Sequence, residues 1–175
     1  VWLFLALELT SLPTYVLVTA ARRHGDAAEA GVKYFFLGAL ATATFLYGFA
    51  LIYGATGSTE FGPIRAAVAE QRIEFGSASP LMVTGMVLAV LGLCYKIAAV
   101  PMHFYAADVY QGAATPVTAV LAFVPKTAGF AAMIAIMGLV QWQLPPSVAW
   151  MLWSVGSLLT ITSVWSTWIP NTCGV

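Results

Sequence analysis

Residues 81–104 read LMVTGMVLAVLGLCYKIAAVPMHF, and this stretch decides the fold. It is longer than the roughly 20 mainly apolar residues that an α-helix, rising about 1.5 Å per residue, needs to cross a hydrocarbon core about 30 Å thick. It also contains a charged side chain, Lys96, and five residues later a proline, Pro101. Charge and proline together at membrane depth indicate a membrane protein with an internal polar path rather than a simple anchor.

The whole chain has the composition of a membrane protein. Of its 175 residues, 61% are hydrophobic and 8% are charged, whereas a typical soluble domain carries about 25% charged residues. Seven Lys and Arg balance seven Asp and Glu, so the chain lacks the basic surface that nucleic-acid binding requires. Five stretches are predicted to span the membrane as helices, because lone strands cannot satisfy their backbone in lipid. They are 1–19, 32–54, 81–104, 116–140 and 148–169. The sequence therefore predicts an all-α, polytopic transmembrane helix bundle with about five spans and broken helices, forming one domain over 1–175.

The connectors between the predicted spans suggest an orientation. Arg22 and Arg23 follow the first span closely, which places that connector on the cytoplasmic side by the positive-inside rule. The connector at 55–80 mixes both charges and is predicted to lie outside, with a short surface helix over 64–75. The first residues lack an initiator Met, a basic region and a cleavage site, so they are not a secretory signal. We expect the N-terminus of the protein to lie upstream.

Four ionisable side chains lie within or at the ends of the predicted spans: Glu8, Lys33, Lys96 and Lys126. A Lys or Asp at mid-bilayer costs about 2.5 to 3.5 kcal/mol on insertion scales, so the three deeper groups together cost up to about 10 kcal/mol. Intramembrane charges usually face one another or a water-filled path, which makes all four candidates for proton transfer. The alternative is an inert buried pair or snorkelling, and this suits Lys33 best because it lies near a helix end.

Prolines are predicted to break two of these helices beside a lysine. Pro101 follows Lys96 by five residues, and Pro125 directly precedes Lys126. A proline inside a helix removes one backbone donor and frees a carbonyl about one turn earlier, and the freed group must face protein or water. The pattern favours hydrated sites at both lysines, with simple packing kinks as the alternative.

His103 and Asp108 follow Pro101 near the inner end of the third predicted span. An imidazole changes charge in the physiological pH range, which suits a proton relay; a hydrogen-bonded histidine at the interface is the alternative. One histidine with one carboxylate is not a metal site, which needs three or four clustered ligands. Cys94 and Cys173 lack ligand spacing and are interpreted as a core and a tail residue. The sequence contains no phosphate loop, nucleophile elbow, or haem or iron–sulfur ligand set, so we expect no redox chemistry in this chain.

Three stretches resemble the membrane subunits shared by respiratory complex I (NADH-quinone oxidoreductase) and multisubunit cation/proton antiporters. They are FLALELTSLPTYVLV (4–18), EAGVKYFFLGALATATFLYGFALIYGATGST (29–59) and YKIAAVPMHFYAADVYQGAATPVTAVLAFVPKTAGF (95–130). In the third stretch, DVYQG (108–112) is similar to the subunit N branch of the family, whereas sister subunits and the antiporters usually show D-A-H or R-A-H there. The resemblance runs from the start of the chain to the end of the fourth predicted span.

The resemblance implies a half-channel of broken helices in which a glutamate and lysines pass protons between the two sides. Glu8 matches the family's buried glutamate, and Lys96 matches the lysine of its first broken helix. Lys126 matches the next lysine along the hydrophilic axis, and Lys33 a lysine at the start of the following helix. The implied partners are other membrane subunits of complex I, in the inner (plasma) membrane of a bacterium; an organellar membrane is less favoured. FMN, iron–sulfur clusters and quinone belong to those other subunits, so no cofactor is expected here.

These residues suggest a charge-pair switch. Burial disfavours the charged form of each group, while a nearby opposite charge favours it. If Glu8 is drawn away from Lys96, that lysine is freed to pass its proton toward Lys126. The alternatives are a subunit of a secondary cation/proton antiporter, a structural membrane subunit whose charges only fix helix packing, and a stand-alone membrane enzyme, for which no nucleophile or cofactor set is present.

Two features depart from the family pattern. The family continues into a second, inverted set of spans with another axial lysine or glutamate, which does not follow here. We therefore expect this chain alone to form no complete proton path. The tail at 163–175, SVWSTWIPNTCGV, replaces a polar loop with basic residues, and we expect it to be a truncated or disturbed end without function.

Overall fold

The computed structural model describes residues 1–20, 25–75, 79–99, 102–139, 149–150, 152–154 and 156–157. Pro101, most of the predicted fifth span at 148–169 and the tail at 163–175 lie outside these residues. Within them the regular structure is entirely helical, which confirms the predicted all-α class. The helices are α1 (Trp2–Ala20), α2 (Gly25–Thr56), α3 (Phe61–Phe75), α4 (Pro80–Lys96), α5 (Phe104–Gly112) and α6 (Thr115–Leu139).

Three of these helices, α1, α2 and α6, are long and apolar enough to cross a membrane. The bounds of α1 and α6 agree closely with the spans predicted at 1–19 and 116–140. By contrast, α2 begins at Gly25 and not at Val32, because the intervening Ala and Glu residues are good helix formers. Its 32 residues measure about 48 Å at about 1.5 Å each, so the helix is longer than the hydrocarbon core is thick. The predicted surface helix at 64–75 is confirmed as α3.

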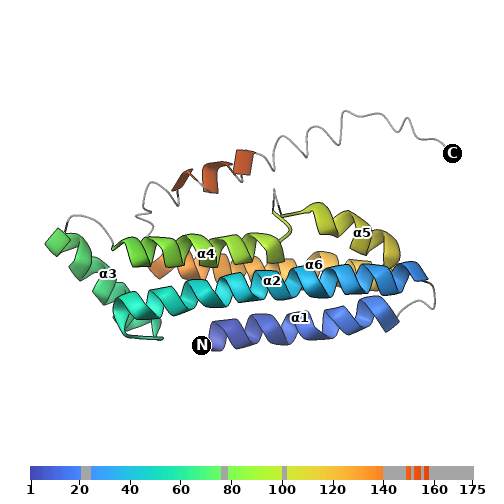
Figure 1. The fold of residues 1–175 in the computed structure, drawn as a ribbon, viewed down its shortest axis with the longest axis horizontal. Coiled ribbons are helices and arrows are strands. Elements are labelled where there is room, and N and C mark those ends of the chain that lie inside the picture. The colour runs from blue at the N-terminus through green and yellow to red at the C-terminus, as the bar shows by residue number, and fades with distance from the viewer. Residues whose placement is uncertain are drawn as a thin grey trace.

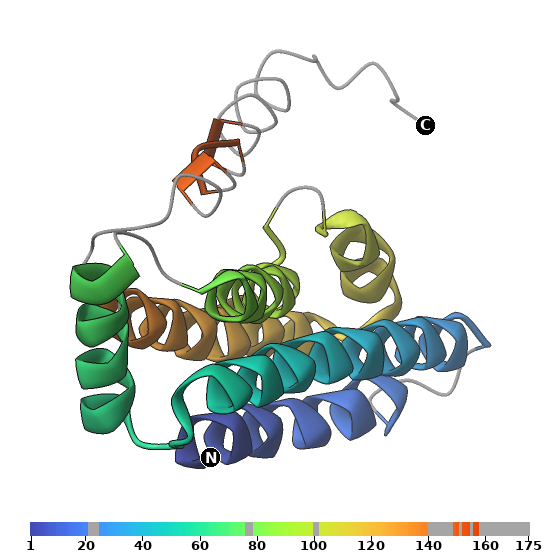
Figure 2. The same ribbon diagram turned by 60° about the vertical axis from the view of Figure 1, so that its left-hand side comes forward.

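Four helices form the body of the molecule. Figures 1 and 2 show α1, α2, α4 and α6 lying side by side with similar axes, while α3 crosses one end. Contacts link α1 to α2, α2 to α4, α4 to α6 and α6 back to α1, which closes a bundle. The short α5 lies at the opposite end from α3 and packs on α2. Both the buried charges and the tyrosines described below lie inside this arrangement.

The stretch predicted as a proline-broken span at 81–104 consists of two helices. Ser79 caps the start of α4, because its hydroxyl accepts a hydrogen bond from the Met82 N–H at 3.3 Å and Pro80 occupies the first turn. α4 ends at Lys96, and α5 begins only at Phe104. The structure therefore agrees with the predicted broken helix in this span, and the tight backbone turn that follows Lys96 ends α4 at the lysine itself.

Small residues allow α2 and α4 to approach closely. A Cβ built on Gly48 would lie 2.6 Å from the Ala89 nitrogen and 2.8 Å from the Gly85 oxygen. A Cβ on Gly92 would lie 2.9 Å from the Ala41 oxygen. Membrane helices commonly pack through such residues, because lipid supplies no hydrophobic drive to bring larger surfaces together. The fully buried side chains around this contact include Phe45, Ile52, Met86, Val90 and Leu93.

The outer face of the bundle is apolar. Large side chains on α1, α2 and α6 are more than half exposed, among them Trp2, Leu9, Phe36, Leu40, Phe123 and Ile134. A soluble monomer rarely exposes so much contiguous apolar surface. Helices with internally satisfied backbones and apolar outer faces are the form that protein takes in lipid. The structure therefore supports an integral membrane protein.

Candidate functional site

A buried ion pair joins α1 to the end of α4. The Lys96 Nζ lies 2.7 Å from Glu8 Oε1, and the two side chains are 7% and 19% exposed, respectively. The two residues are 88 positions apart in sequence. Burying two charges carries a large desolvation cost, and only close geometry with additional hydrogen bonds offsets it. The hydrogen bonds around the pair therefore determine whether this desolvation cost is offset.

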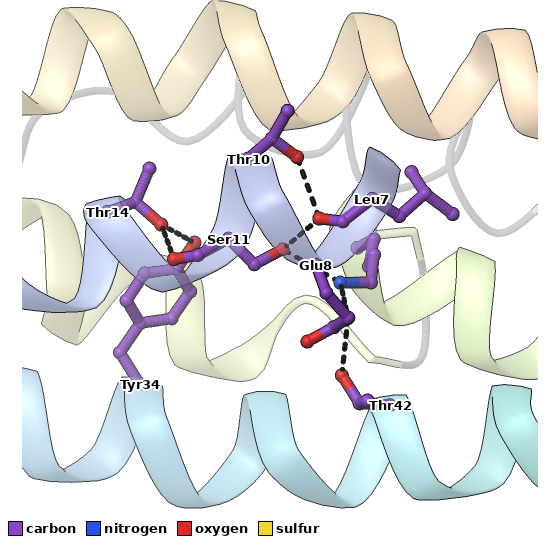
Figure 3. A network of polar contacts seen from close by, with 8 residues as sticks. Leu7, Glu8, Thr10, Ser11, Thr14, Tyr34 and Thr42 are labelled. Atoms are coloured by element: carbon purple, nitrogen blue, oxygen red, sulfur yellow. Dashed lines mark hydrogen bonds and ion pairs between the residues drawn. The ribbon is translucent and has the colours of Figure 1, made fainter. Parts of the chain in front are cut away.

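Two hydroxyls complete the pair, as Figure 3 shows. The Thr42 hydroxyl of α2 donates to Glu8 Oε1 at 2.9 Å, and Lys96 Nζ donates to Ser11 Oγ at 2.8 Å. Ser11 in turn donates to the Leu7 carbonyl at 2.8 Å. α1, α2 and α4 thus each supply part of one network. Each hydroxyl contacts one member of the pair, so both charged groups have a hydrogen-bond partner besides each other.

The backbone after Lys96 ends α4 in a Schellman motif. Ala98 N–H donates to the Tyr95 carbonyl at 2.9 Å, and Ala99 N–H donates to the Cys94 carbonyl at 2.7 Å. Ala98 has φ of 55°, in the left-handed region that glycine normally occupies at this position. This turn stops the helix at the lysine. It leaves Lys96 in the last turn, at the edge of the interruption between α4 and α5.

We expect Ala98→Gly to stabilise the protein. An L-residue in the left-handed conformation costs about 1 to 2 kcal/mol, while glycine loses about 0.5 to 1 kcal/mol more backbone entropy on folding, so a net gain of about 0.5 to 1 kcal/mol should result. Thermal unfolding of the full-length protein in detergent measures it. Ala99→Gly is the matched control, since Ala99 is not left-handed; equal shifts from the two variants would contradict the assignment.

Lys33 belongs to a separate, exposed ion pair. Its Nζ lies 2.8 Å from Glu29 of the same helix and 3.0 Å from Asp108 of α5. The Lys33 side chain is 45% exposed. The pair links the first half of α2 to α5 at the bundle end away from α3. Unlike Lys96, Lys33 is therefore a bridging charge at the surface of this chain, and its predicted part in proton transfer stays a prediction.

Lys126 lies on α6 and does not join the Glu8–Lys96 network by any hydrogen bond or ion pair among the described residues. Its Nζ lies 5.4 Å from the centre of the Tyr110 ring, within cation–π range. The helix break predicted at Pro125 is wrong, because α6 runs unbroken from Thr115 to Leu139. A single proline removes one hydrogen bond, and the turns on either side can keep the helix intact.

His103 occupies the position before the first residue of α5, with its side chain exposed and making no capping hydrogen bond. Pro101 lies outside the described residues. Within the described residues, no hydrogen bond or salt bridge joins the His103 side chain to either ion pair. Its predicted place in a relay stays a prediction.

Sequence reasoning missed the polar partners of the pair. Ser11 lies three residues after Glu8 on the same helical face, so the spacing could have marked it. Nothing local marks Thr42, because its contact with Glu8 crosses between two helices. Asp108 was considered only beside His103, whereas the structure pairs it with Lys33, 75 positions away.

Comparisons with known proteins agree with this architecture. The family described as "NADH:quinone oxidoreductase/Mrp antiporter, TM" matches residues 1–169. The chain is 41% identical over 165 residues to NADH-quinone oxidoreductase subunit N of Myxococcus xanthus, covering 92% of this chain and 30% of that protein.

Two solved structures are also similar. A chain of respiratory complex I from Thermus thermophilus with bound aureothin superposes with a TM-score of 0.66 at 42% identity, covering 83% of this chain and 29% of that one. A chain of the Mrp complex from Dietzia sp. gives a TM-score of 0.66 at 26% identity, covering 77% of this chain and 24% of that one. The sequence thus spans about a third or less of the length of these relatives.

Proposed function

The chain belongs to the NADH:quinone oxidoreductase/Mrp antiporter transmembrane family, and on that premise we propose that it is a proton-translocating segment of a complex I subunit N. The buried Glu8–Lys96 pair carries the proposal. Two ionisable groups in contact inside an apolar bundle can exchange a proton, and intramembrane ionisable groups mark proton paths in other membrane proteins. The identity of 41% to a subunit N supports the choice within the family.

In the proposed cycle, Lys96 holds its proton while Glu8 is close and charged. When Glu8 is neutralised or drawn away, the ammonium loses its counter-charge and passes the proton onward along the membrane axis. Lys126 is the proposed acceptor. Since no direct contact joins Lys126 to the pair among the described residues, the transfer requires water between them. The hydroxyls of Thr42 and Ser11 keep both partners oriented while one of them is neutral.

The energy for this cycle would come from outside the chain. We propose that FMN, iron–sulfur clusters and quinone lie in partner subunits, and that this chain carries no cofactor. Its partners would be other membrane subunits of a bacterial plasma-membrane complex. Redox events in those partners would bias the position or charge of Glu8.

Glu8→Gln in the full-length protein tests the proposal. The glutamine keeps the shape and can still accept from Thr42, but it cannot hold a proton in exchange. We expect NADH-driven proton pumping in membrane vesicles to fall at least about tenfold, because a positioned proton carrier contributes about a hundredfold or more. Glu60→Gln, at an exposed carboxylate in the α2–α3 connection, should leave pumping unchanged. Normal pumping by an assembled Glu8→Gln complex would rule the proposal out.

A second candidate function is proton exchange against a cation without redox chemistry. It is favoured by the similarity to a chain of the Mrp complex. Sodium-dependent proton movement by the full-length protein, in vesicles given neither NADH nor quinone, would select this candidate.

A further inference from the structure

Four tyrosine rings, one from each of α1, α2, α5 and α4, pack in a continuous series. Tyr15 meets Tyr34 edge-on with ring centres 4.8 Å apart. Tyr34 stacks on Tyr105 at 5.8 Å, and Tyr105 stacks on Tyr95 at 4.4 Å. Tyr34, Tyr95 and Tyr105 are all less than a tenth exposed. The series therefore builds an aromatic wall with phenolic hydroxyls inside the bundle.

This wall lies between the two ion pairs. On α2, Thr42 contacts Glu8 of the buried pair, and Tyr34 comes eight residues earlier, about 12 Å along the helix axis. The next residue toward the helix start is Lys33, which pairs with Asp108 at the exposed end. A route from that end to Lys96 therefore passes the tyrosines.

The hydroxyl hydrogens of Thr14, Tyr34 and Tyr105 are all donated to acceptors within this region. Thr14 donates its one hydrogen to the Ser11 carbonyl at 2.6 Å, so in the 3.3 Å contact between Thr14 and Tyr34 the tyrosine is the donor (Figure 3). The Tyr34 oxygen keeps its lone pairs for a further donor. Tyr105 donates to the Tyr95 carbonyl at 2.9 Å. These bonds use the hydrogens of three hydroxyls and leave acceptor capacity at Tyr34.

The Tyr95 hydroxyl is the exception. The residue is 6% exposed, and its hydroxyl has no hydrogen-bond partner among the described residues. Buried hydroxyls are almost always paired, with protein or with ordered water. Tyr34 and Tyr15 continue the ring series that runs from Tyr95 through Tyr105, and the Tyr34 oxygen keeps acceptor capacity. A water beside the buried Tyr95 hydroxyl needs two to four polar partners, and the other hydroxyls of this ring series are the candidates.

We propose that Tyr95, with Tyr34 and Tyr15, holds an ordered water, and that this buried water site belongs to the proton-uptake route from the exposed Lys33–Asp108 end to Lys96. The proposal rests on the proton-translocating function given above. The water accepts a hydrogen bond or donates one at each tyrosine, so it extends the polar network past Ser11 and Thr14 into the aromatic wall. Tyr95 acts here as a positioning residue for the water.

A density map of the full-length protein in its membrane complex, at a resolution that shows ordered water, tests the site directly. We expect a water peak within hydrogen-bond distance of the Tyr95 hydroxyl and of Tyr34 or Tyr15. A protein side chain in that place, or an empty apolar space, would overturn the proposal.

Tyr95→Phe tests the role. It removes only the hydroxyl, and losing one hydrogen bond from the route should slow proton pumping about two- to tenfold. Thermal unfolding should show no gain in stability. If the hydroxyl were merely unsatisfied, its removal would raise the unfolding midpoint and leave pumping intact, and this pair of results would refute the proposal. Tyr47→Phe, at a ring 60% exposed on α2, is the control that should change neither.

Failure of this inference is distinguishable from failure of the proposed function. Loss of pumping in Glu8→Gln together with normal pumping in Tyr95→Phe would overturn the water route alone. Normal pumping in Glu8→Gln would overturn the function on which the route depends.

Discussion

Lys96→Met in the full-length protein should lower its free energy of unfolding by about 3 to 5 kcal/mol, because removing one partner of a buried ion pair leaves an uncompensated charge. Glu8 is 19% exposed, so water relieves little of that cost. Methionine is chosen because it is close to the aliphatic part of lysine in volume and flexibility. The unfolding midpoint in detergent and proton pumping in vesicles should both fall.

The double variant Glu8→Gln/Lys96→Met separates packing from function. Replacing both members of a buried pair with groups of similar volume is often neutral or stabilising. We expect the double variant to recover most of the lost stability, while pumping remains absent because no titratable group is left at the site. Recovery of pumping together with stability would show that the pair only fixes helix packing, which is the role of a structural membrane subunit.

Gly48→Ala should be strongly destabilising. Its new Cβ would lie 2.6 Å and 2.8 Å from backbone atoms of Ala89 and Gly85, which cannot rotate away as a side chain could. The helices α2 and α4 must then separate, at a cost of about 1 to 3 kcal/mol or more. Since α4 carries Lys96 and α2 carries Thr42, the same separation should also weaken pumping.

Gly54→Ala is the matched control on α2. Its Cβ would meet only the flexible end of Leu81 at 3.5 Å, an ordinary contact. Alanine also favours the helix by about 1 kcal/mol over glycine, so this variant should unfold at the same or a higher temperature. Equal losses from Gly48→Ala and Gly54→Ala would show that the close approach of α2 and α4 is not limiting.

Hydrophobic length and charge placement were sufficient to predict much of this fold. The runs that form α1 and α6 are apolar apart from one charged residue in each, Glu8 and Lys126, so their bounds followed from the sequence. An interruption of residues 81–104 was predicted from Pro101, and the structure ends α4 at Lys96. The left-handed turn at Ala98 sets that end, and alanine carries no sequence signal for such a turn.

The candidate site was only partly predictable. Glu8 and Lys96 were each identified from the sequence, because a charged residue within an apolar span is costly and usually has a function. Their contact, like that of Thr42 with Glu8, depends on how the helices pack and has no local pattern. The break predicted at Pro125 failed for a different reason. Proline is a strong local signal for a helix break, but the hydrogen bonds of the neighbouring turns keep α6 continuous.

The position of Lys96 at the very end of α4 has a further consequence. Peptide dipoles aligned along a helix place about half a negative elementary charge at its C-terminus, worth about 0.3 to 1 kcal/mol to a nearby cation and up to about 2 kcal/mol when partly buried. The end of α4 therefore supplies a fixed counter-charge that cannot be protonated or moved. When Glu8 is neutral, the ammonium group is left beside this weaker, permanent partner. In the proposed cycle, this permanent partner would lower the cost of the step in which Glu8 is neutral, without replacing Glu8 as the main counter-charge.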